Sequence, residues 1–348
     1  MKPRKTSISV LVGLSMTLVS AAAAADTPTL YLGSYGGSTQ EVFQSKLLPK
    51  FEKEHNVKIV YIPGNSSDTL AKLQAQKNAP EMDVVLLDEG PMYQAVQFGF
   101  CDKIDKSAPV YKDLYSLADL GPKAVALGAI ATGLFYNTEA FKKKGYAPPT
   151  SWFDLADPKF KQKIVIPPIN NTYGLQTLIM FARLNHGSEK NIDPGFNYII
   201  KKINPNVLAW EPSPGTMTSL FQNQEAILGV WGSGRVEALK ETGFPAKFVY
   251  PKEGAMALQI AVCPIVKSNV PKLSQELIQY LLSPQVQQVL AKYQGWGPVN
   301  KTAKLSPDIA AKVPYGPAAI NSMLKTDWGT VNPKRADWTN RWNRTVER

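Results

Sequence analysis

Short apolar runs alternate with amphipathic segments along most of this chain, and this alternation constrains the fold more than any other feature of the sequence. The run 83–87 is almost continuously apolar, which is typical of a strand buried on both faces of a sheet. Phe43, Leu47 and Phe51 instead recur at every fourth position within 39–55, which is the spacing of one helix face. Apolar strands separated by such helices predict an α/β fold with parallel strands covered by helices on both faces.

The alternation runs through two units, which we expect to form two lobes. It pauses at Pro148-Pro149-Thr150 and then resumes, and 348 residues are more than one hydrophobic core serves. The expected strands span 29–34, 57–62, 83–87, 129–136, 164–166, 207–210, 226–231 and 247–250, with a further apolar stretch at 257–265. The expected helices span 39–55, 67–77, 138–144, 173–186, 196–203, 216–222, 273–282, 284–294 and 337–347, and another ends at 242.

Residues 1–25 are predicted to be a cleaved signal peptide. Lys2, Arg4 and Lys5 precede a mostly apolar run, 8–19, which is too short to span a bilayer, and alanines stand before Asp26. Such a signal directs export. A lipid anchor would require a cysteine at the cleavage point, so we expect a freely diffusing exported protein.

Composition argues against several classes of function. The net charge is +11, to which the predicted signal contributes three charges, but the other Lys and Arg residues are dispersed, with dense runs only at 142–144 and 201–202. Solvated helix faces explain such runs, so no nucleic-acid partner is expected. The two histidines have no second ligand at metal spacing, and neither a metal nor a cofactor is expected. Cys101 and Cys263 either pair as one disulfide or remain buried thiols.

Candidate site residues lie mainly in loops that follow strands. In open α/β sheets, ligands bind beyond the carboxyl ends of the strands, where loops lead into helix N-termini. Five such loops supply the expected ligand contacts: Ser34, Tyr35 and Gly36; Asp88 and Glu89; Asn171, Thr172 and Tyr173; Trp231, Ser233 and Arg235; and Trp296. Gln259, within the apolar stretch 257–265, completes the set.

Most of these loops also have a purely structural interpretation. The loop at Tyr35 either contacts a ligand or only turns the strand into a helix. Asp88 and Glu89 either receive an ammonium group or act as favourable charges near the N-terminus of the following helix. Asn171 and its neighbours either cap a helix or contact a ligand, and Trp296 either lines a cleft or packs against a hinge.

Arg235 is the most suggestive of the candidates. It follows Gly232-Ser233-Gly234 at a predicted helix start, a sequence that combines free backbone N–H groups, a hydroxyl and a guanidinium beside the ring of Trp231. Such a set suits a carboxylate or a phosphonate, because arginine forms a bidentate fork and the helix terminus adds positive potential. The alternative is that Arg235 pairs with an acid on the surface.

Six short motifs are spread over nearly the whole chain after the predicted signal. They are Ser34-Tyr35-Gly36-Gly37, Gly133-Leu134-Phe135-Tyr136-Asn137, Pro148-Pro149-Thr150-Ser151-Trp152, Asp157-Pro158-Lys159-Phe160-Lys161, Leu281-Leu282-Ser283-Pro284-Gln285-Val286-Gln287 and Gly295-Trp296-Gly297-Pro298-Val299-Asn300. Together and in this order they resemble the periplasmic solute-binding proteins of ABC importers. The branch they resemble contains the spermidine/putrescine receptors and their relatives for other small solutes.

The resemblance implies a two-lobed periplasmic-binding-protein fold of type II. Each lobe would be a mixed sheet flanked by helices, with the ligand in the cleft between the lobes. Lobe 1 is expected to combine 26–134 with 255–305, and lobe 2 to combine 135–254 with 306–348, which includes a C-terminal helix. The resemblance also implies a binding protein and no enzyme, with an ABC importer permease in the inner membrane as its partner. Together with the predicted signal peptide, it implies a receptor in the periplasm of a Gram-negative cell, and we expect a monomer.

The cleft residues favour a zwitterionic or anionic amine, such as an amino acid derivative or an aminophosphonate. In the polyamine receptors that the chain resembles, cleft acids hold the ammonium groups, one of them near 257–260, but this chain has no carboxylate there. Arg235 opposite Asp88 or Glu89 would instead suit a ligand with both charges, since a buried charge needs a partner. A polyamine is the alternative ligand.

Two other classes of function are weaker alternatives. An exported hydrolase would need a Gly-x-Ser-x-Gly elbow with a histidine nearby, but Trp231 stands where the first glycine should precede Ser233. A protein-interaction module at the cell surface is the other alternative. We therefore expect a receptor for a small solute.

Overall fold

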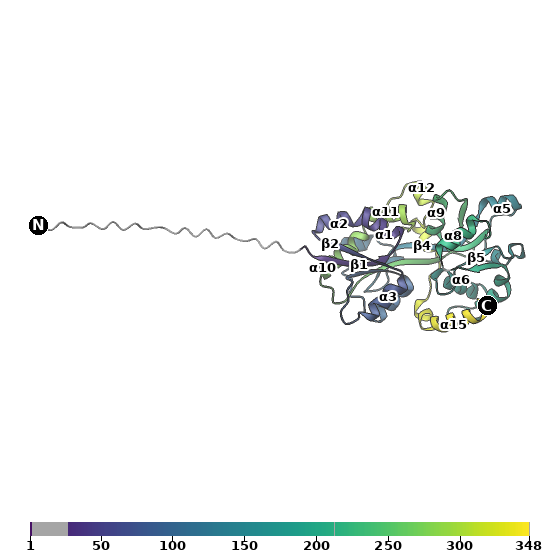
Figure 1. The fold of residues 1–348 in the computed structure, drawn as a ribbon, viewed down its shortest axis with the longest axis horizontal. Coiled ribbons are helices and arrows are strands. Elements are labelled where there is room, and N and C mark those ends of the chain that lie inside the picture. The colour runs from purple at the N-terminus through teal and green to yellow at the C-terminus, as the bar shows by residue number, and fades with distance from the viewer. Residues whose placement is uncertain (2–26, 212, 348) are drawn as a thin grey trace.

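A single mixed sheet organises the computed structural model, which describes residues 1, 27–211 and 213–347 (Figure 1). Its strands are β1 (Thr29–Tyr35), β2 (Lys58–Gly64), β3 (Val84–Asp88), β4 (Val125–Asn137), β5 (Ile164–Ile166), β6 (Val207–Trp210), β7 (Leu228–Gly232), β8 (Ala246–Val249) and β9 (Met256–Pro264). They lie in the order β2-β1-β3-β9-β4-β7-β5-β6, and β8 pairs with β4 outside this path. The predicted signal peptide, apart from Met1, lies outside the described residues.

Parallel strands form the two ends of the sheet, and antiparallel strands join them. β1 pairs in parallel with β2 and β3, while β5 pairs in parallel with β6 and β7. β4 runs antiparallel to β9 from Val125, opposite Val262, to Thr132, opposite Met256, and beyond Thr132 it pairs with β7 and β8 instead. We call β1, β2, β3 and β9 the first half and β5 to β8 the second half. The two sheets expected for two lobes are therefore one sheet, because the 13 residues of β4 are long enough to pair on both sides.

Helices cover the sheet on both faces. The first half carries α1 (Ser38–Val42), α2 (Leu48–His55), α3 (Ser66–Ala75), α4 (Glu89–Gln97), α10 (Pro271–Leu281) and α11 (Pro284–Gln294). The second half carries α5 (Thr138–Lys144), α6 (Thr172–Leu184), α7 (Asp193–Tyr198), α8 (Pro214–Gln222), α9 (Ser233–Glu241) and α15 (Arg335–Thr345), and α12 (Pro307–Ala310), α13 (Gly316–Ser322) and α14 (Trp328–Val331) lie in the connecting tail. None of these described helices is long and apolar enough to cross a bilayer.

The buried strand β3 contributes to a different hydrophobic core on each of its faces. On β3, Leu86 joins the core that contains Phe51 of α2, whereas its neighbours Val85 and Leu87 join the core that contains Leu73 of α3. Successive side chains of a strand point to opposite faces, so a continuously apolar strand requires cover on both. This arrangement confirms the α/β layering that the apolar runs predict.

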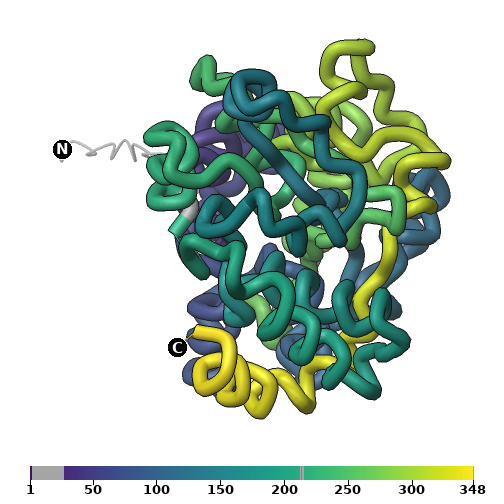
Figure 2. The backbone as a smooth tube through the Cα atoms, turned by 90° about the vertical axis from the view of Figure 1, so that its right-hand side faces the viewer, coloured from purple at the N-terminus to yellow at the C-terminus, as the bar shows by residue number. Residues whose placement is uncertain are grey.

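The last part of the chain crosses between the two halves. Figure 2 shows this segment, in yellow, running down one side of the molecule to α15. Trp328 of α14 lies against Gly90 of α4, where an added Cβ would come within 2.6 Å of the indole ring. Asn332 Nδ2 donates to Gly90 O at 3.1 Å, and Trp342 of α15 is buried beside Trp210 of the second half. The segment therefore ties α4 to the second half.

Cys101 and Cys263 form a disulfide, which decides between the two arrangements left open by the sequence. Cys263 lies in β9, and Cys101 follows α4, so the bond fixes that segment to the sheet of the first half.

Candidate ligand-binding site

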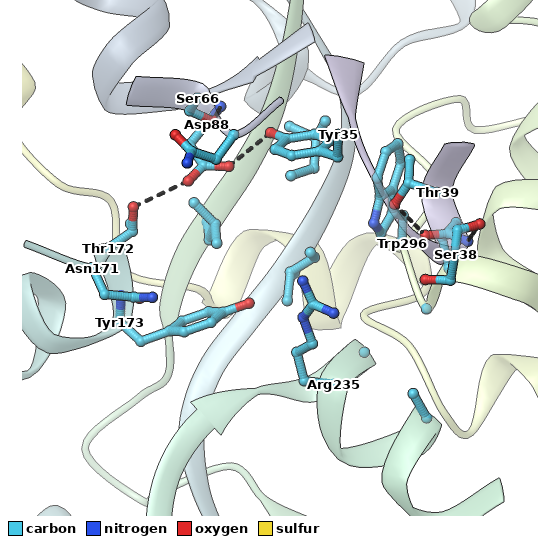
Figure 3. Close-up of a pocket in the computed structure, with 18 of the residues that line it drawn as sticks. Tyr35, Ser38, Thr39, Ser66, Asp88, Asn171, Thr172, Tyr173, Arg235 and Trp296 are labelled. Atoms are coloured by element: carbon cyan, nitrogen blue, oxygen red, sulfur yellow. Dashed lines mark hydrogen bonds between the residues drawn. The ribbon is translucent and has the colours of Figure 1, made fainter. Parts of the chain in front are cut away.

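A cavity of about 600 Å³ is lined by residues of both halves (Figure 3). Tyr35 and Asp88 end strands β1 and β3 of the first half. Tyr173 and Arg235 lie in the first turns of α6 and α9, which follow β5 and β7 of the second half. The cavity therefore lies where parallel strands end and helices begin, as expected for a ligand site in an open α/β sheet.

The carboxylate of Asp88 joins the two halves of the molecule. Its Oδ1 accepts from Tyr35 Oη at 2.7 Å, and its Oδ2 accepts from Thr172 Oγ1 of the second half at 3.2 Å. The Asp88 backbone N–H donates to Ser66 Oγ at 2.9 Å. Burial and the negative charge of Asp88 raise the pKa of Tyr35 well above its ordinary value, so the phenol keeps its proton and remains a donor to the carboxylate.

Arg235 faces the cavity from the start of α9. Figure 3 shows its guanidinium beside the hydroxyl of Tyr173, opposite Tyr35 and Asp88. Burial raises the pKa of Tyr173 to about 12, although the charge of Arg235 opposes that rise. Within the described part of the chain, no carboxylate lies within ion-pair distance of Arg235. The surface ion pair considered as the alternative for Arg235 is thus not formed there.

A second arginine, Arg335, lines the same cavity and was missed by the reading of the sequence. It is the first residue of α15, and its Nη2 donates to Asn170 O at 3.2 Å. Burial lowers the pKa of Arg335, and the charge of Asp88 offsets part of that effect, which places the two side chains within electrostatic reach. No local pattern marks position 335, because the contact depends on how the tail folds back.

Trp296 both lines the cavity and packs against the crossing strand β4, so its two proposed roles coexist. It is buried, and its ring meets that of Tyr35 edge to face with centroids 6.3 Å apart. Gly128 of β4 makes room for it, since a Cβ there would lie 2.9 Å from the Trp296 Cβ. Gln287 holds the following loop, donating to Leu127 O at 2.7 Å and accepting from Val299 N at 2.9 Å.

Seven of the expected ligand contacts line this cavity: Tyr35, Asp88, Asn171, Thr172, Tyr173, Arg235 and Trp296. Ser34, Gly36, Glu89, Trp231, Ser233 and Gln259 do not line it. Asn171 serves its other expected role as well, because its Oδ1 caps α6 by accepting from Tyr173 N at 3.0 Å. Each of the five expected loops thus contributes at least one residue to the cavity lining, and their role as ligand contacts stays a prediction.

Gln259 points away from the cavity because of the alternation of side chains along β9. Its neighbours Leu258 and Ile260 line the cavity, whereas Gln259 is buried on the other face and donates through Nε2 to Leu117 O at 2.5 Å. A strand presents every second residue to one face. Placing Gln259 among the ligand contacts was therefore an error of one position in register.

The end of β7 and the start of α9 direct two further candidates into the interior. Trp231 packs beside Phe135, with ring centroids 5.4 Å apart, and Ser233 Oγ accepts from the backbone N–H of Ala131 at 3.2 Å. At the first loop, Ser34 is buried and Gly36 is exposed outside the cavity lining. These residues shape the site without reaching it.

Glu89 turns away from the cavity although it directly follows Asp88. It is the first residue of α4, so the helical turn directs its side chain toward Trp328 of the tail. Burial raises the pKa of Glu89 to about 7, a rise that Trp328 and the positive charge of Lys325 partly oppose. Glu89 therefore belongs to the contact between α4 and the tail.

Other charged side chains that line the cavity have local partners. Glu241 pairs with Lys312 at 3.5 Å, and Glu237 lies 3.5 Å from Lys240. Further lining residues missed in the sequence come from helix starts, namely Ser38 and Thr39 of α1, Asn65 before α3, and Ser66, Ser67 and Asp68 of α3. The polar starts of these helices after strands were a usable signal for them.

The remaining features of the described residues give no support to catalysis. Ser233 is engaged with β4, and His55 lies on α2, where Nδ1 is 3.2 Å from Glu276 Oε2. In the described ranges, no group of three or more His, Cys, Asp or Glu side chains is placed to hold a metal ion.

Known proteins with similar sequences and folds include solute-binding proteins. The model of the bacterial extracellular solute-binding protein family matches residues 46–315. The spermidine/putrescine-binding periplasmic protein of Salmonella typhimurium is 26% identical over 328 residues, which cover 89% of each chain. The crystal structure of an ABC transporter from Clostridium perfringens is 27% identical, with a TM-score of 0.78 over 91% of this chain and 99% of that one.

A third similar protein bears on the fold alone. The periplasmic binding protein AfuA of Actinobacillus pleuropneumoniae, with fructose-6-phosphate bound, is 22% identical and has a TM-score of 0.74 over 92% of this chain and 99% of that one. Together with the Clostridium perfringens structure, it identifies the α/β fold as that of the periplasmic binding proteins.

Proposed function

This chain belongs to the family of bacterial extracellular solute-binding proteins, and we propose that its cavity captures a small amine that also carries an anionic group. An amino acid derivative or an aminophosphonate has this chemistry. As the solute-binding component of an ABC transporter, the chain is a binding protein and not an enzyme. We further propose that it works as a monomer in the periplasm of a Gram-negative cell, where it delivers the solute to the importer's permease in the inner membrane.

The single observation that carries the proposal is the position of Arg235. Its guanidinium faces the cavity and, among the described residues, has no carboxylate within ion-pair distance. A carboxylate or phosphonate can accept two parallel hydrogen bonds from such a fork. The adjacent Tyr173 hydroxyl stays protonated at neutral pH and is a further donor to the same anion.

The ammonium group of the ligand has a complementary partner in Asp88. Its carboxylate already accepts from Tyr35 and Thr172, and an ionised carboxylate has about four acceptor positions in all, so positions remain for an ammonium group. The rings of Tyr35 and Trp296 line the same region, and aromatic faces attract cations.

A polyamine is the second candidate ligand, because the Salmonella typhimurium relative is a spermidine/putrescine-binding protein and because Asp88 lies among aromatic rings. Two arginines in the cavity lining count against a polyamine, because their positive charges would repel its ammonium groups. The wall formed by β9 offers Leu258 and Ile260 to the cavity and no acid to a second ammonium group.

Calorimetric titration tests the proposal. Protein freed of bound solute by unfolding and refolding is titrated with amino acids, aminophosphonates, putrescine and spermidine. We expect an anionic amine to bind and Arg235→Ala to weaken its binding by about 10- to 100-fold, the value of a charge-assisted hydrogen bond. Arg341→Ala is the control, because Arg341 pairs with Asp193 and is not among the residues that line the cavity.

The polyamine alternative predicts the opposite pattern. Tight binding of putrescine or spermidine that survives Arg235→Ala, with no binding of any anionic amine, would contradict the proposal.

A further inference from the structure

We propose that Arg335 is a second anion-binding residue of this cavity, and that the ligand therefore carries two anionic charges and one ammonium group. This inference rests on the proposed function and narrows its ligand class. Compounds of this kind are aminodicarboxylates and amines with a dianionic phosphonate or phosphate group.

The charges around the cavity support this class of ligand. Among the other lining residues, Glu241 and Glu237 have lysine partners, and Asp68 accepts from Asn65 Nδ2 at 2.6 Å. Lys292 also lines the cavity and lies exposed beside the Tyr293 ring, 5.1 Å from its centroid.

The exposed Asp68 and Lys292 carry opposite charges and add no net charge to the lining. Three lining charges are then left for a ligand, namely Asp88, Arg235 and Arg335. One acid against two guanidiniums leaves one positive charge over, so a ligand with a single anionic group and an ammonium group would not balance it. A ligand with two anionic charges and one ammonium group does, and charges in a cleft favour such complementarity.

Arg335 is held in place by the tail and still has donors to offer. Asn332 donates to Gly90 O, and Trp328 packs on Gly90, so the tail enters α15 directly beside the helix that follows Asp88. Only Nη2 of Arg335 makes a hydrogen bond within the described residues, to Asn170 O at 3.2 Å, whereas a guanidinium has five N–H donors. Burial of the group lowers its pKa, and an anionic ligand would relieve that cost.

A purely structural role for Arg335, pinning α15 to the loop before α6, would predict no effect on ligand choice. A role in recognition predicts that Arg335 sets the preference between one and two anionic charges. The two roles are separated by a ratio of affinities, which a general loss of stability leaves unchanged.

The experiment uses two pairs of probes that differ in anionic charge. Glutamate is compared with 4-aminobutyrate, which lacks one carboxylate, and 2-aminoethylphosphonate is compared with β-alanine, which has a carboxylate in place of the phosphonate. Each is titrated calorimetrically against the wild-type protein, Arg335→Gln, Arg335→Lys and the control Arg341→Gln. The first pair reports a second carboxylate and the second pair reports a dianionic phosphonate.

We expect the more anionic member of at least one pair to bind the wild-type protein about tenfold or more tightly than its partner, the effect of roughly one charge-assisted hydrogen bond. Arg335→Gln should remove that preference while changing the affinity for the less anionic member by no more than about twofold. Arg335→Lys should restore part of the preference, and Arg341→Gln should retain all of it.

Several results would overturn the inference. A ligand with two anionic charges is ruled out if the wild-type protein binds 4-aminobutyrate and β-alanine as tightly as, or more tightly than, glutamate and 2-aminoethylphosphonate. It is also ruled out if neither glutamate nor 2-aminoethylphosphonate binds. If Arg335→Gln loses the same affinity for both members of a pair, Arg335 has a structural role. If this variant fails to fold, an unchanged preference for the more anionic member in Arg335→Lys leads to the same conclusion. Binding of 4-aminobutyrate that depends on Arg235 would leave the proposed function standing, whereas binding of putrescine alone would overturn both.

Discussion

Replacing Glu89 with glutamine should stabilise the protein at alkaline pH and leave it unchanged at acidic pH. Glu89 is the first residue of α4 and lies against Trp328 of the tail. Burial raises its pKa from 4.5 to about 7, which means that folding disfavours the charged form of this carboxyl group. Glutamine has nearly the same shape and no charge to desolvate.

The sign and size follow from the coupling of proton binding to folding. At pH values below 4.5 the carboxyl is protonated in both the folded and the unfolded chain, so it does not reduce the free energy of unfolding. Between pH 4.5 and about 7 the unfolded chain ionises first, so the free energy of unfolding falls as pH rises, and the loss is complete above pH 7. At about 1.4 kcal/mol per pKa unit, the full loss is roughly 3 kcal/mol.

Urea denaturation at a series of pH values from 4.5 to 8.5 measures this effect. We expect the free energy of unfolding of Glu89→Gln to match that of the wild-type protein at the acidic end and to exceed it by roughly 3 kcal/mol at the alkaline end. Glu139→Gln is the control, because Glu139 occupies the first turn of α5 in the same way but is exposed. A difference that does not vary with pH, or a variant less stable than wild type at pH 8.5, would refute the reasoning.

Two further predictions concern the segments that hold the site together. Reduction of the disulfide, or the double change Cys101→Ala and Cys263→Ala, should lower the free energy of unfolding by about 3 to 5 kcal/mol, because the bond closes a loop across 162 positions. Urea denaturation with and without reductant measures this loss, and equal unfolding midpoints would contradict the prediction. Gly90→Ala should lower the free energy of unfolding by about 1 to 3 kcal/mol, since the new Cβ would come within 2.6 Å of the Trp328 ring. It should also weaken ligand binding by moving the tail. Unchanged stability and affinity would count against the packing of Trp328 on Gly90.

Much of the fold was predictable because strands and helices leave local periodic signals. The expected strand 83–87 and helix 284–294 correspond to β3 (Val84–Asp88) and α11 (Pro284–Gln294), and the tail helix to α15 (Arg335–Thr345). The length of β4 was underestimated, since 129–136 extends to Val125–Asn137. Its first residues pair with β9, a partner distant in sequence, and local composition does not report such pairing.

The candidate site was predictable as a set of loops and less so as a set of side chains. Tyr35 and Asp88 end strands and Arg235 follows one, so the rule that ligands bind beyond strand ends finds them. Gln259 was misplaced because a register shift of one residue reverses the face to which a strand side chain points. Arg335 was missed because its place in the cavity depends on the return of the tail across α4.

By itself, the sequence determined the layered α/β architecture and, through six ordered motifs, the family that the chain resembles, and it predicts a signal peptide at 1–25. These properties depend on periodicity and on short local motifs, both of which can be recognised in the sequence without the structure. Only the tertiary structure decided that Cys101 pairs with Cys263, that Asp88 bridges the two halves to Thr172, and that Arg335 joins the cavity. Each of these contacts brings together residues far apart along the chain, and their meeting is set by the packing of helices on a shared sheet.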